Sequence, residues 1–472
     1  MRRTLFSDDA PPPVHTRFAR VVMERAIDAP DGLTYAAPES IADLAVGDRV
    51  EAPLGRGDRA APGYIVRLGP DADGLDPARI KPLIRRTGQR LTPALVELAL
   101  WMARYYICAP GVVFASMLPG AVKSSTKSRT REVIERTGAA PEGKLTPALA
   151  QAWAAISALP DTAFPAPAKT LAQAAALKNT APITRLVAMG ALRKARRVST
   201  ADAADDIPIP AVREVTLTDH QRAATDGVVS TLGQFRAHVL RGVTGSGKTE
   251  VYLRVLDAAV ERGDAAIVLV PEISLTPQTA GRFLARFKSR GVAVLHSGLT
   301  ESQRREQWSA VARGEKRIVV GARSAIFAPF PPSLRLGVII VDEEHDDAYK
   351  QDQAPRYHGR DVAIKRAQIE GCPVVLGSAT PSLESWRNAT EGRHTLHELP
   401  ERVGGVKLPK VDIVDMAEER RARPWRENRV RLLGPRLEKA VGDTLAEGGQ
   451  AILLLNRRGF ANYICCPDNR CG

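Results

Sequence analysis

Cysteines and long apolar runs are scarce in this sequence, and each scarcity excludes a class of protein. Five of the 472 residues are cysteines, and three of these fall in the last eight positions. That number and spacing do not make a disulfide framework, and they fit a reducing cytoplasm. No stretch approaches the roughly 18 apolar residues that a membrane span needs, since the most apolar one, residues 95–114, contains Glu97 and Arg104. We therefore expect neither a secreted nor a membrane protein.

Leader and repeat features are also missing. The N-terminal residues carry two arginines without an apolar segment behind them, so we expect no secretory signal. There is no internal repeat and no extended low-complexity tract, which excludes fibrous classes. The composition, 44% hydrophobic and 25% charged, is that of an ordinary globular protein. The length predicts three or four domains at about 100–200 residues each.

Acidic residues are outnumbered by basic ones. The chain has 67 lysines and arginines against 53 aspartates and glutamates, which gives a net charge of +14. Such a surplus favours a polyanionic partner, and nucleic acid is the commonest one. A basic solvated surface without a specific partner would show the same balance, so charge alone does not decide between the two.

Residues 15–120 are predicted to form a small β-rich domain that ends in a helix. Short strand-like stretches at 18–24, 48–53 and 63–68 are separated by Gly, Pro and Asp residues. Thr92 followed by a proline is a typical helix start, and apolar residues line one face of the segment that follows.

Residues 123–200 are predicted to hold three short Ala-rich helices, at 146–158, 168–177 and 180–193, which end in the basic segment 193–197. This order resembles a winged-helix domain, although plain helical bundles are equally often Ala-rich. The acidic and proline-containing residues 201–210 are predicted to be a linker.

Residues 211–400 alternate apolar runs with helical stretches. This alternation predicts buried parallel strands in a doubly wound α/β sheet. The predicted strands are 237–240, 266–270, 292–295, 317–320, 338–341 and 374–376. Thr300 and Gln303 form a capping box that starts one of the intervening helices, and Gly314 ends it. A helix at 435–447 and a strand at 451–455 predict the start of another α/β unit within residues 405–472.

The sharpest motif fits GxxxxGK[ST]. It follows a predicted strand and opens a predicted helix, which is the context that a phosphate-binding loop requires. Its residues are Gly242, Val243, Thr244, Gly245, Ser246, Gly247, Lys248 and Thr249. In such a loop backbone N–H groups surround the phosphates, the lysine supplies a positive charge and the threonine hydroxyl ligates Mg²⁺. The motif therefore predicts a site for ATP and Mg²⁺.

A second motif follows the predicted strand 338–341 and supplies carboxylates. Asp342 is predicted to hold the Mg²⁺ ion, and Glu343 to polarise the attacking water. His345, two residues later, is either part of this site or an ordinary surface histidine. Ser378 and Thr380 follow the strand 374–376, where their hydroxyls are expected to sense the carboxylates and couple the nucleotide state to a neighbouring lobe.

The ends of two further strands offer groups for a phosphodiester. Arg323 and the following serine end the strand 317–320, and Glu272 follows the strand 266–270. We expect Arg323 to contact DNA.

Seven segments of the chain, in this order, resemble the PriA family of replication restart DNA helicases in superfamily 2. They are GVTGSGKTEVY, LVPEISLTPQ, LHSGLTESQR, VGARSAIFAPF, DEEHDDAYKQDQAPRYHGRD, LGSATPSLES and LNRRGF. The sequence pattern DEEH-x₃-YKQ-x₄-RYH-x-RD is much more specific than a generic helicase box. The resemblance extends from about residue 18 to residue 472 and is strongest from 217 to 386.

The resemblance implies an ATP-driven 3′-to-5′ DNA helicase that recognises stalled replication forks and starts primosome assembly. Its implied partners are forked and single-stranded DNA, DNA 3′ ends, primosome proteins, single-stranded DNA-binding protein and the loader of the replicative helicase. Residues 15–120 would bind the 3′ end of a nascent strand, 123–200 would be the winged helix, and 211–400 would be the first helicase lobe, of the RecA-like P-loop class. Residues 405–472 would begin the second lobe and its zinc region.

The resemblance also assigns individual residues. Gln221 stands where superfamily 2 helicases place a glutamine that contacts adenine, and a solvated glutamine is the alternative. A loop that couples DNA contact to ATP hydrolysis would comprise Tyr349, Lys350, Arg356, Tyr357 and His358. The chemistry is reasonable, because aromatic rings stack on bases and cations hold phosphates.

Two departures from the family concern ligands. In the family's pocket for a 3′ end a carboxylate lies between two aromatic residues, whereas here Tyr35 is retained and Thr34 stands in place of the acid. Zn²⁺ is implied by the family, but Cys466 and Cys471 form the one matching pair, and Cys465 is the one further cysteine beside it. Since a structural zinc site needs four ligands, we expect no stoichiometric zinc in this chain.

The third departure concerns length, because most of the family's second lobe lies beyond residue 472. We therefore expect the chain to bind ATP, Mg²⁺ and DNA but to unwind poorly. Two alternatives remain open from the sequence. One is a fork-binding module that binds ATP without effective unwinding, and the other is a translocase on double-stranded DNA.

Overall fold

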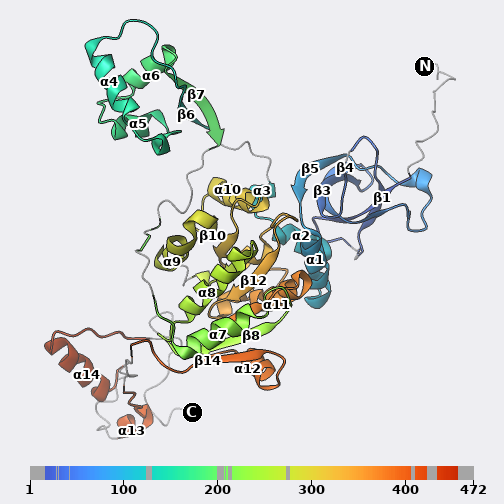
Figure 1. Ribbon diagram of the computed structural model, residues 1–472. Helices are drawn as coiled ribbons and strands as arrows, with labels where there is room; N and C mark the ends of the chain where they lie inside the picture. Colours follow the sequence, from blue (N-terminus) through green and yellow to red (C-terminus); the bar gives the residue numbers. More distant parts are fainter. Residues whose placement is uncertain are drawn as a thin grey trace, which may run out of the picture. The chain divides into compact units, whose positions relative to one another are not determined.

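The computed structural model describes most of the chain in two compact units, residues 1–405 and 406–472 (Figure 1). The described residues are 16–27, 29, 31–41, 43–123, 130–198, 207, 209–210, 215–272, 277–404, 410–421 and 433–454. The first unit contains every residue of the predicted ATP site. Most of the predicted linker, together with Cys466 and Cys471, lies outside the described residues.

A seven-stranded sheet forms the centre of the region 215–404, and all its pairings are parallel. Its order is β10-β11-β9-β12-β13-β8-β14. The strands are β8 (Ala237–Gly242), β9 (Ala265–Leu269), β10 (Val292–Leu295), β11 (Ile318–Gly321), β12 (Leu336–Val341), β13 (Val374–Ser378) and β14 (Thr395–Leu399). All six predicted strands are confirmed. The seventh, β14, was not predicted, because it is a half-exposed edge strand with a mixed sequence.

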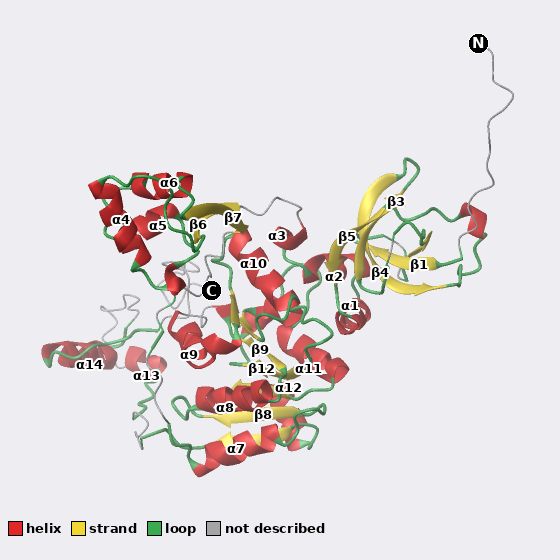
Figure 2. Cartoon of the chain, turned by 45° about the horizontal axis from the view of Figure 1, so that its top comes forward, coloured by secondary structure: helices red, strands yellow, loops and turns green. Residues whose placement is uncertain are grey.

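Helices cover both faces of this sheet (Figures 1 and 2). They are α7 (Asp219–Val229), α8 (Lys248–Glu261), α9 (Pro277–Phe287), α10 (Glu301–Ala312), α11 (Gly359–Glu370) and α12 (Leu383–Thr390). Alternate residues of β9 enter two separate cores. Ile267 packs in the core that contains α10 and α11, whereas Val268 packs in the core that contains α7, α8 and α9. This two-sided burial explains why the strands are continuous apolar runs, and it confirms the doubly wound α/β fold.

The first domain is an antiparallel sheet of five strands in the order β2-β1-β4-β3-β5. The strands are β1 (Phe18–Met23), β2 (Leu33–Ala36), β3 (Asp48–Leu54), β4 (Arg59–Gly69) and β5 (Arg85–Arg90). The expected strands correspond to β1, β3 and β4. The other two were missed because β2 has four residues and β5, with the sequence RRTGQR, has no apolar side chain.

Three helices connect this domain to the parallel sheet: α1 (Pro93–Tyr105), α2 (Pro110–Met117) and α3 (Gly120–Lys123). As predicted, Thr92 caps α1, and its Oγ1 accepts a hydrogen bond from the N–H of Leu95. Gly111 allows α2 to lie against β1, because a Cβ there would lie 1.9 Å from the carbonyl oxygen of Met23. On the other side α1 packs against α11 and α3 against α10, within one shared core.

Residues 130–198 fold around a core of their own. The elements are β6 (Thr130–Arg136), α4 (Pro147–Ser157), α5 (Ala168–Ala174), α6 (Ala181–Ala188) and β7 (Leu192–Val198). The three predicted helices are present, but the third ends earlier than expected, because Gly190 has a φ of +74°. The basic segment 193–197 is therefore part of a strand, where Arg193 pairs with Glu135 and Lys194 with Glu132. Three helices and a two-stranded sheet agree with the winged-helix prediction, which stays a prediction.

The described part of the second unit holds two helices, α13 (Met416–Arg421) and α14 (Pro435–Ala446). The second confirms the helix predicted at 435–447. The strand predicted at 451–455 is not formed by the described residues 451–454, of which Ile452 is 96% exposed. An apolar run becomes a strand when another strand pairs with it, and no such pairing is present for residues 451–454 among the described residues.

Every helix in the described part of the chain is too short or too polar to span a membrane.

Two histidines, one fully buried and one half-buried, join the edge strand β14 to the sheet. His238 on β8 and His397 on β14 share a hydrogen bond of 3.0 Å between Nδ1 and Nε2. The Nε2 of His238 lies 3.0 Å from the hydroxyl of Thr231. Burial lowers the pKa of His238 to about 3, and the neighbouring His397 and Arg236 add to the effect. Both rings are therefore neutral at neutral pH, since burial lowers the pKa of His397 as well.

This pair predicts a loss of stability in mild acid. An unfolded His238 takes up a proton near pH 6.5, whereas the folded one does not until about pH 3, so the unfolded state is stabilised relative to the folded state as the pH falls between those values. From pH 7 to pH 5 this one group should lower the free energy of unfolding by about 2 kcal/mol. The measurement is urea unfolding of wild type and His238→Gln across that range, and the variant should show a smaller decline.

His220→Gln serves as the control, because that side chain is exposed at the start of α7. It should decline with pH as the wild type does. An equal decline in wild type and His238→Gln would contradict the assignment.

Candidate nucleotide site

The predicted phosphate loop joins the end of β8 to the start of α8. Gly245 and Gly247 both have a φ of +82°, a conformation that other residues rarely adopt. A Cβ on Gly247 would also lie 2.4 Å from the Nε2 of Gln221. The ammonium of Lys248, the first residue of α8, donates to the carbonyl of Gly242 at 3.0 Å. The loop is held from outside as well, because the N–H of Val403 donates to the carbonyl of Gly245 at 3.0 Å.

A cavity of about 760 Å³ lies over this loop. Residues 244–250 line it together with Arg282, Arg286, Asp342 and Glu343. The cavity therefore combines a helix N-terminus and three cationic side chains with the carboxylates of Glu250, Asp342 and Glu343, and a nucleotide polyphosphate with a divalent cation requires groups of these kinds. The hydroxyl of Ser246 is buried and has no hydrogen-bond partner among the described residues. The residues present fit a nucleotide with Mg²⁺, and Thr249 and Asp342 are the groups placed to hold the metal.

The carboxylates come from the turn after β12. In the sheet, β13 lies between β12 and the loop strand β8. The Oδ1 of Asp342 accepts a hydrogen bond of 2.9 Å from the hydroxyl of Tyr252 on α8. Burial raises the pKa of Asp342 above its usual value. A cation bound beside this carboxylate would act in the opposite direction and favour its ionised form. Glu343 has a φ of +45°, and its Oε1 lies 3.8 Å from the Nζ of Lys248.

The structure also brings together the residues predicted to couple the site to its surroundings. The Nδ1 of His345 lies 2.7 Å from the hydroxyl of Ser378 and 3.7 Å from the Oε2 of Glu343. Thr380 takes part through its backbone, because its N–H donates to the Ser378 hydroxyl at 2.9 Å while its side chain is exposed. These contacts connect the turn after β12 to the turn after β13.

A buried carboxylate that we did not single out strengthens this connection. Glu344 is fully buried, and it accepts hydrogen bonds from the N–H of Ser382 at 2.7 Å and from the hydroxyl of Ser385 at 2.9 Å. The guanidinium of Arg360 lies 3.2 Å from its Oε2. Glu344 and Arg360 both occur in the sequence pattern DEEH…RD, which was the signal that could have revealed them. The pattern did not show that their side chains contact each other.

Gln221 makes contacts that differ from the expected one. It is 2% exposed, and its side chain completes a capping box with Thr218 at the start of α7. Its Nε2 donates to the carbonyl of Ser246 at 2.8 Å. The amide is thus occupied by the backbone of α7 and of the phosphate loop, and it does not line the cavity. In this structure Gln221 positions the loop, and its assignment as an adenine contact stays a prediction.

Two aromatic residues of the expected DNA-coupling loop are buried. Tyr349 is 1% exposed and Tyr357 4% exposed. The hydroxyl of Tyr349 donates to the backbone carbonyl of Asp342 at 2.6 Å, and the ring of Tyr357 packs edge-on against Phe327. The burial of both rings in this structure does not support stacking on bases, and that role stays a prediction. Their burial holds the loop against the sheet.

The other residues of the loop are fixed mainly by backbone contacts. One nitrogen of the Arg323 guanidinium donates to the carbonyls of Ala348 and Lys350, so this residue holds the loop, and its expected contact with DNA stays a prediction. The Nζ of Lys350 donates to the carbonyl of Arg356 at 2.8 Å. The side chain of Arg356 is exposed. The half-buried His358, whose pKa is lowered by burial, donates its backbone N–H to the hydroxyl of Tyr106 on α1 at 3.1 Å.

In the first domain the ring of Tyr35 is also buried. It is 4% exposed, and its hydroxyl donates to the carbonyl of Pro53 at 3.0 Å, so this arrangement does not support the expected contact with DNA, which stays a prediction. Thr34 donates to the carboxylate of Asp73 at 2.6 Å, and Arg20 pairs with the same carboxylate at 3.1 Å. A carboxylate therefore does lie beside Thr34. It comes from the loop after β4, where the local sequence could not reveal it.

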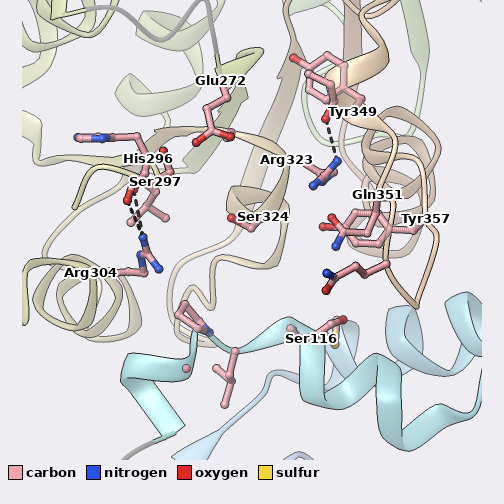
Figure 3. Close-up of a pocket in the computed structure, with 18 of the residues that line it drawn as sticks. Ser116, Glu272, His296, Ser297, Arg304, Arg323, Ser324, Tyr349, Gln351 and Tyr357 are labelled. Atoms are coloured by element: carbon pink, nitrogen blue, oxygen red, sulfur yellow. Dashed lines mark hydrogen bonds between the residues drawn. The ribbon is translucent and has the colours of Figure 1, made fainter. Parts of the chain in front are cut away.

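A second cavity, of about 690 Å³, lies at the carboxyl ends of β9, β10 and β11. Glu272, Ser297 and Ser324 follow these three strands, and residues 116–120 close the opposite side. Figure 3 shows Arg304 and Ser297 on one side of this space and Arg323 on the other. The lining is polar, and crevices at the carboxyl ends of parallel strands are common ligand sites.

The buried pair of Glu344 and Arg360 predicts a large effect on stability. Removing the Glu344 carboxylate breaks this buried pair and takes the acceptor away from the N–H of Ser382 and the hydroxyl of Ser385, and breaking a buried pair typically costs about 3–5 kcal/mol. We expect Glu344→Ala to lower the free energy of unfolding by that amount, measured by urea denaturation. Glu384→Ala is the matched control, because Glu384 lies 3.7 Å from the same guanidinium but its side chain is 72% exposed. Equal effects of the two substitutions would contradict the assignment.

Comparison with known protein families agrees with this architecture. Residues 218–389 match the DEAD/DEAH box helicase family. Residues 20–119 match the family described as the 3′ DNA-binding domain. The two matches cover the parallel sheet and the antiparallel domain with its helices.

Three curated relatives extend the similarity. The replication restart protein PriA of Bacillus subtilis is 46% identical over 296 residues, which cover 62% of this chain and 35% of that protein. The PriA proteins of Chlamydia pneumoniae and Haemophilus influenzae are 34% and 33% identical, over 92% and 95% of this chain and 57% and 59% of their own lengths. The chain thus spans between 35% and 59% of these relatives. The chain is therefore similar to PriA replication restart proteins along the part of their length that it spans, and its two family matches fall within that part.

Proposed function

We propose that this chain carries the ATP-hydrolysing and DNA-contacting part of a helicase that restarts replication at stalled forks. One observation supports the ATPase assignment above all others. Lys248 of the phosphate loop and the carboxylates of Asp342 and Glu343 line one cavity, with 3.8 Å between the ammonium and the Glu343 carboxylate. Because the chain spans 35% to 59% of its relatives, the activity of the whole protein is part of the proposal.

The roles of the residues follow from their positions. Lys248 holds the terminal phosphates, and Glu343 orients the attacking water and accepts its proton. The hydroxyl of Thr249 and the carboxylate of Asp342 hold Mg²⁺, which when bound neutralises charge on the phosphate oxygens. Tyr252 fixes the rotamer of Asp342 through the hydrogen bond of 2.9 Å. The water that Glu343 orients reaches the site through the cavity over the loop.

Coupling to DNA would use the two turns that meet at Ser378. A shift of Glu343 on hydrolysis is passed to His345, 3.7 Å away, and from there to Ser378. The carbonyl of Asp342 accepts from the Tyr349 hydroxyl, so the same shift reaches the loop 347–358. The exposed Arg356 on that loop is the cation available to a DNA phosphate.

The remaining parts of the proposal rest on the family. They are 3′-to-5′ polarity, recognition of forks and of DNA 3′ ends, and contacts with primosome proteins, single-stranded DNA-binding protein and the replicative helicase loader. The net charge of +14 supports binding to DNA. The family implies Zn²⁺, and the expectation that this chain holds no stoichiometric zinc stays a prediction, because Cys466 and Cys471 lie outside the described residues. In the described ranges there is no group of three or more His, Cys, Asp or Glu residues placed to hold a metal.

The test of the ATPase assignment is a set of three substitutions. Lys248→Ala should reduce ATP hydrolysis in the presence of single-stranded DNA by about a hundredfold or more, because one preorganised group at the transferred phosphate contributes that much. Asp342→Asn should lose Mg²⁺-dependent hydrolysis and keep some nucleotide binding. Lys288→Ala, which removes an exposed lysine after α9, should hydrolyse ATP as the wild type does. Wild-type turnover in Lys248→Ala would show that the site is misassigned.

DNA binding should depend steeply on salt and little on sequence. Contacts to four phosphates of a single strand predict an affinity about 50-fold lower at 200 mM than at 50 mM salt. The measurement is fluorescence anisotropy with labelled single strands of two unrelated sequences. A fork with a recessed 3′ end at its junction should bind more tightly than plain duplex. A flat salt dependence would contradict a DNA-binding role, and strand displacement on the same fork distinguishes a helicase from a translocase on duplex DNA.

A further inference from the structure

Aromatic side chains gather at the C-terminal end of α1. The rings of Trp101 and Tyr105 are stacked with centroids 4.7 Å apart, and Tyr106 meets Tyr105 edge-on at 4.9 Å. We call these three residues the aromatic ladder. Tyr105 is 59% exposed, although large aromatic side chains usually bury most of their surface. The ladder thus offers one open ring face to the solvent, in contrast to the buried rings of Tyr349 and Tyr357.

The residue that follows the ladder is unusual in two ways. Ile107 is 94% exposed, and its φ is +49°. A β-branched residue is rarely found in this left-handed region, where glycine or asparagine would be relaxed. The turn between α1 and α2 therefore holds an apolar side chain out in the solvent at a cost in backbone energy. Strained, exposed positions of this kind occur at functional sites, where the strain is part of the function.

Cations accompany the aromatic ladder. The Nζ of Lys365 on α11 lies 5.9 Å from the ring centre of Trp101, and the Nζ of Lys350 lies 5.7 Å from that of Tyr106. Arg104 is exposed on α1. On α11 the carboxylate of Asp361 is already paired with Arg360 at 3.0 Å. Flat rings with interleaved cations are the surface that binds unpaired bases and their phosphates.

The aromatic ladder is attached to the ATP site through short contacts. The hydroxyl of Tyr106 accepts the backbone N–H of His358 at 3.1 Å, and α1 packs along α11 (Figures 1 and 2). The loop that ends at His358 begins at Asp342, whose carbonyl accepts from Tyr349. A displacement of the aromatic ladder is therefore transmitted to the loop that carries the catalytic carboxylates.

We propose that Tyr105 and Ile107 form a wedge at the junction of single-stranded and double-stranded DNA. The open ring of Tyr105 stacks on the first unpaired base, and Ile107 packs against the last base pair. Lys350 and Lys365 hold the phosphates on either side. This inference rests on the proposed function as a DNA helicase, and it adds the place on the chain at which the two strands part.

The experiment uses the 472-residue chain and a forked DNA that carries 2-aminopurine at the first unpaired position, without nucleotide. Stacking on an aromatic ring quenches the fluorescence of this base analogue. We expect the wild type to quench it, and Tyr105→Ala and Ile107→Gly to lose most of the quenching. Tyr105→Ala should weaken fork binding about fivefold or more, the lower limit for one base–aromatic stack, and Ile107→Gly should weaken it through the lost contact with the last base pair. Binding to blunt duplex should be unchanged.

Two controls separate this effect from a loss of structure. Phe235→Ala removes another partly exposed aromatic ring, which lies before the amino end of β8, and should behave as the wild type. Ile107→Gly relieves the left-handed strain, so its melting temperature should not fall.

Three results would overturn the wedge. The first is that the double variant Tyr105→Ala/Ile107→Gly binds forks and quenches the fluorescence as the wild type does. This result would contradict the wedge, and it is expected if Tyr105 and Ile107 contact a protein instead. An equal loss of affinity for blunt duplex would show that the patch does not read the unpaired base. Failure of the wild type to bind forks at all would overturn the proposed function itself, whereas the first two results would leave that function intact.

Discussion

The contact between Lys248 and Glu343 depends on the order of the strands. The lysine follows β8 and the glutamate follows β12, 95 residues later in the chain, and the charged groups lie 3.8 Å apart because β13 alone separates the two strands. In a parallel sheet every carboxyl end lies on the same edge, so the loops that follow the strands converge there. The nucleotide site, the turn that carries Ser378 and the second cavity all lie along this edge.

Four consecutive residues after β12 serve four different partners. Asp342 bonds to Tyr252, Glu343 approaches Lys248, Glu344 is clamped by Ser382 and Ser385, and His345 reaches Ser378. The turn is irregular at Glu343, whose φ is +45°. A continued strand would alternate its side chains between the two faces of the sheet and could not serve these four partners in this way. The left-handed residue is therefore part of the arrangement of the site.

The sequence was sufficient for features that are local or strongly patterned. Buried parallel strands, the phosphate loop and the capped helices α1 and α10 each have a signature within about 15 residues. It was insufficient where a side chain has more than one use. The spacing of Gln221 suggested an adenine contact, but its amide caps α7 and holds Ser246. Tyr349 and Tyr357 carry the composition of a stacking loop, yet their burial depends on the tertiary packing of that loop. Asp73 meets Thr34 across 39 residues, a distance that no motif bridges.

The last strand of the sheet also determines how the chain leaves this domain. The carbonyl of Leu399, at the end of β14, accepts from the N–H of Val243, and the N–H of Val403 donates to the carbonyl of Gly245. Both bonds end on the phosphate loop. The segment that leads out of the first unit is thus held to the phosphate loop by two backbone hydrogen bonds. A pulling force on the chain beyond residue 404 would act on the phosphate loop before it acted on any other part of the sheet. The segment that leaves the domain and a bound nucleotide would therefore act on the same loop.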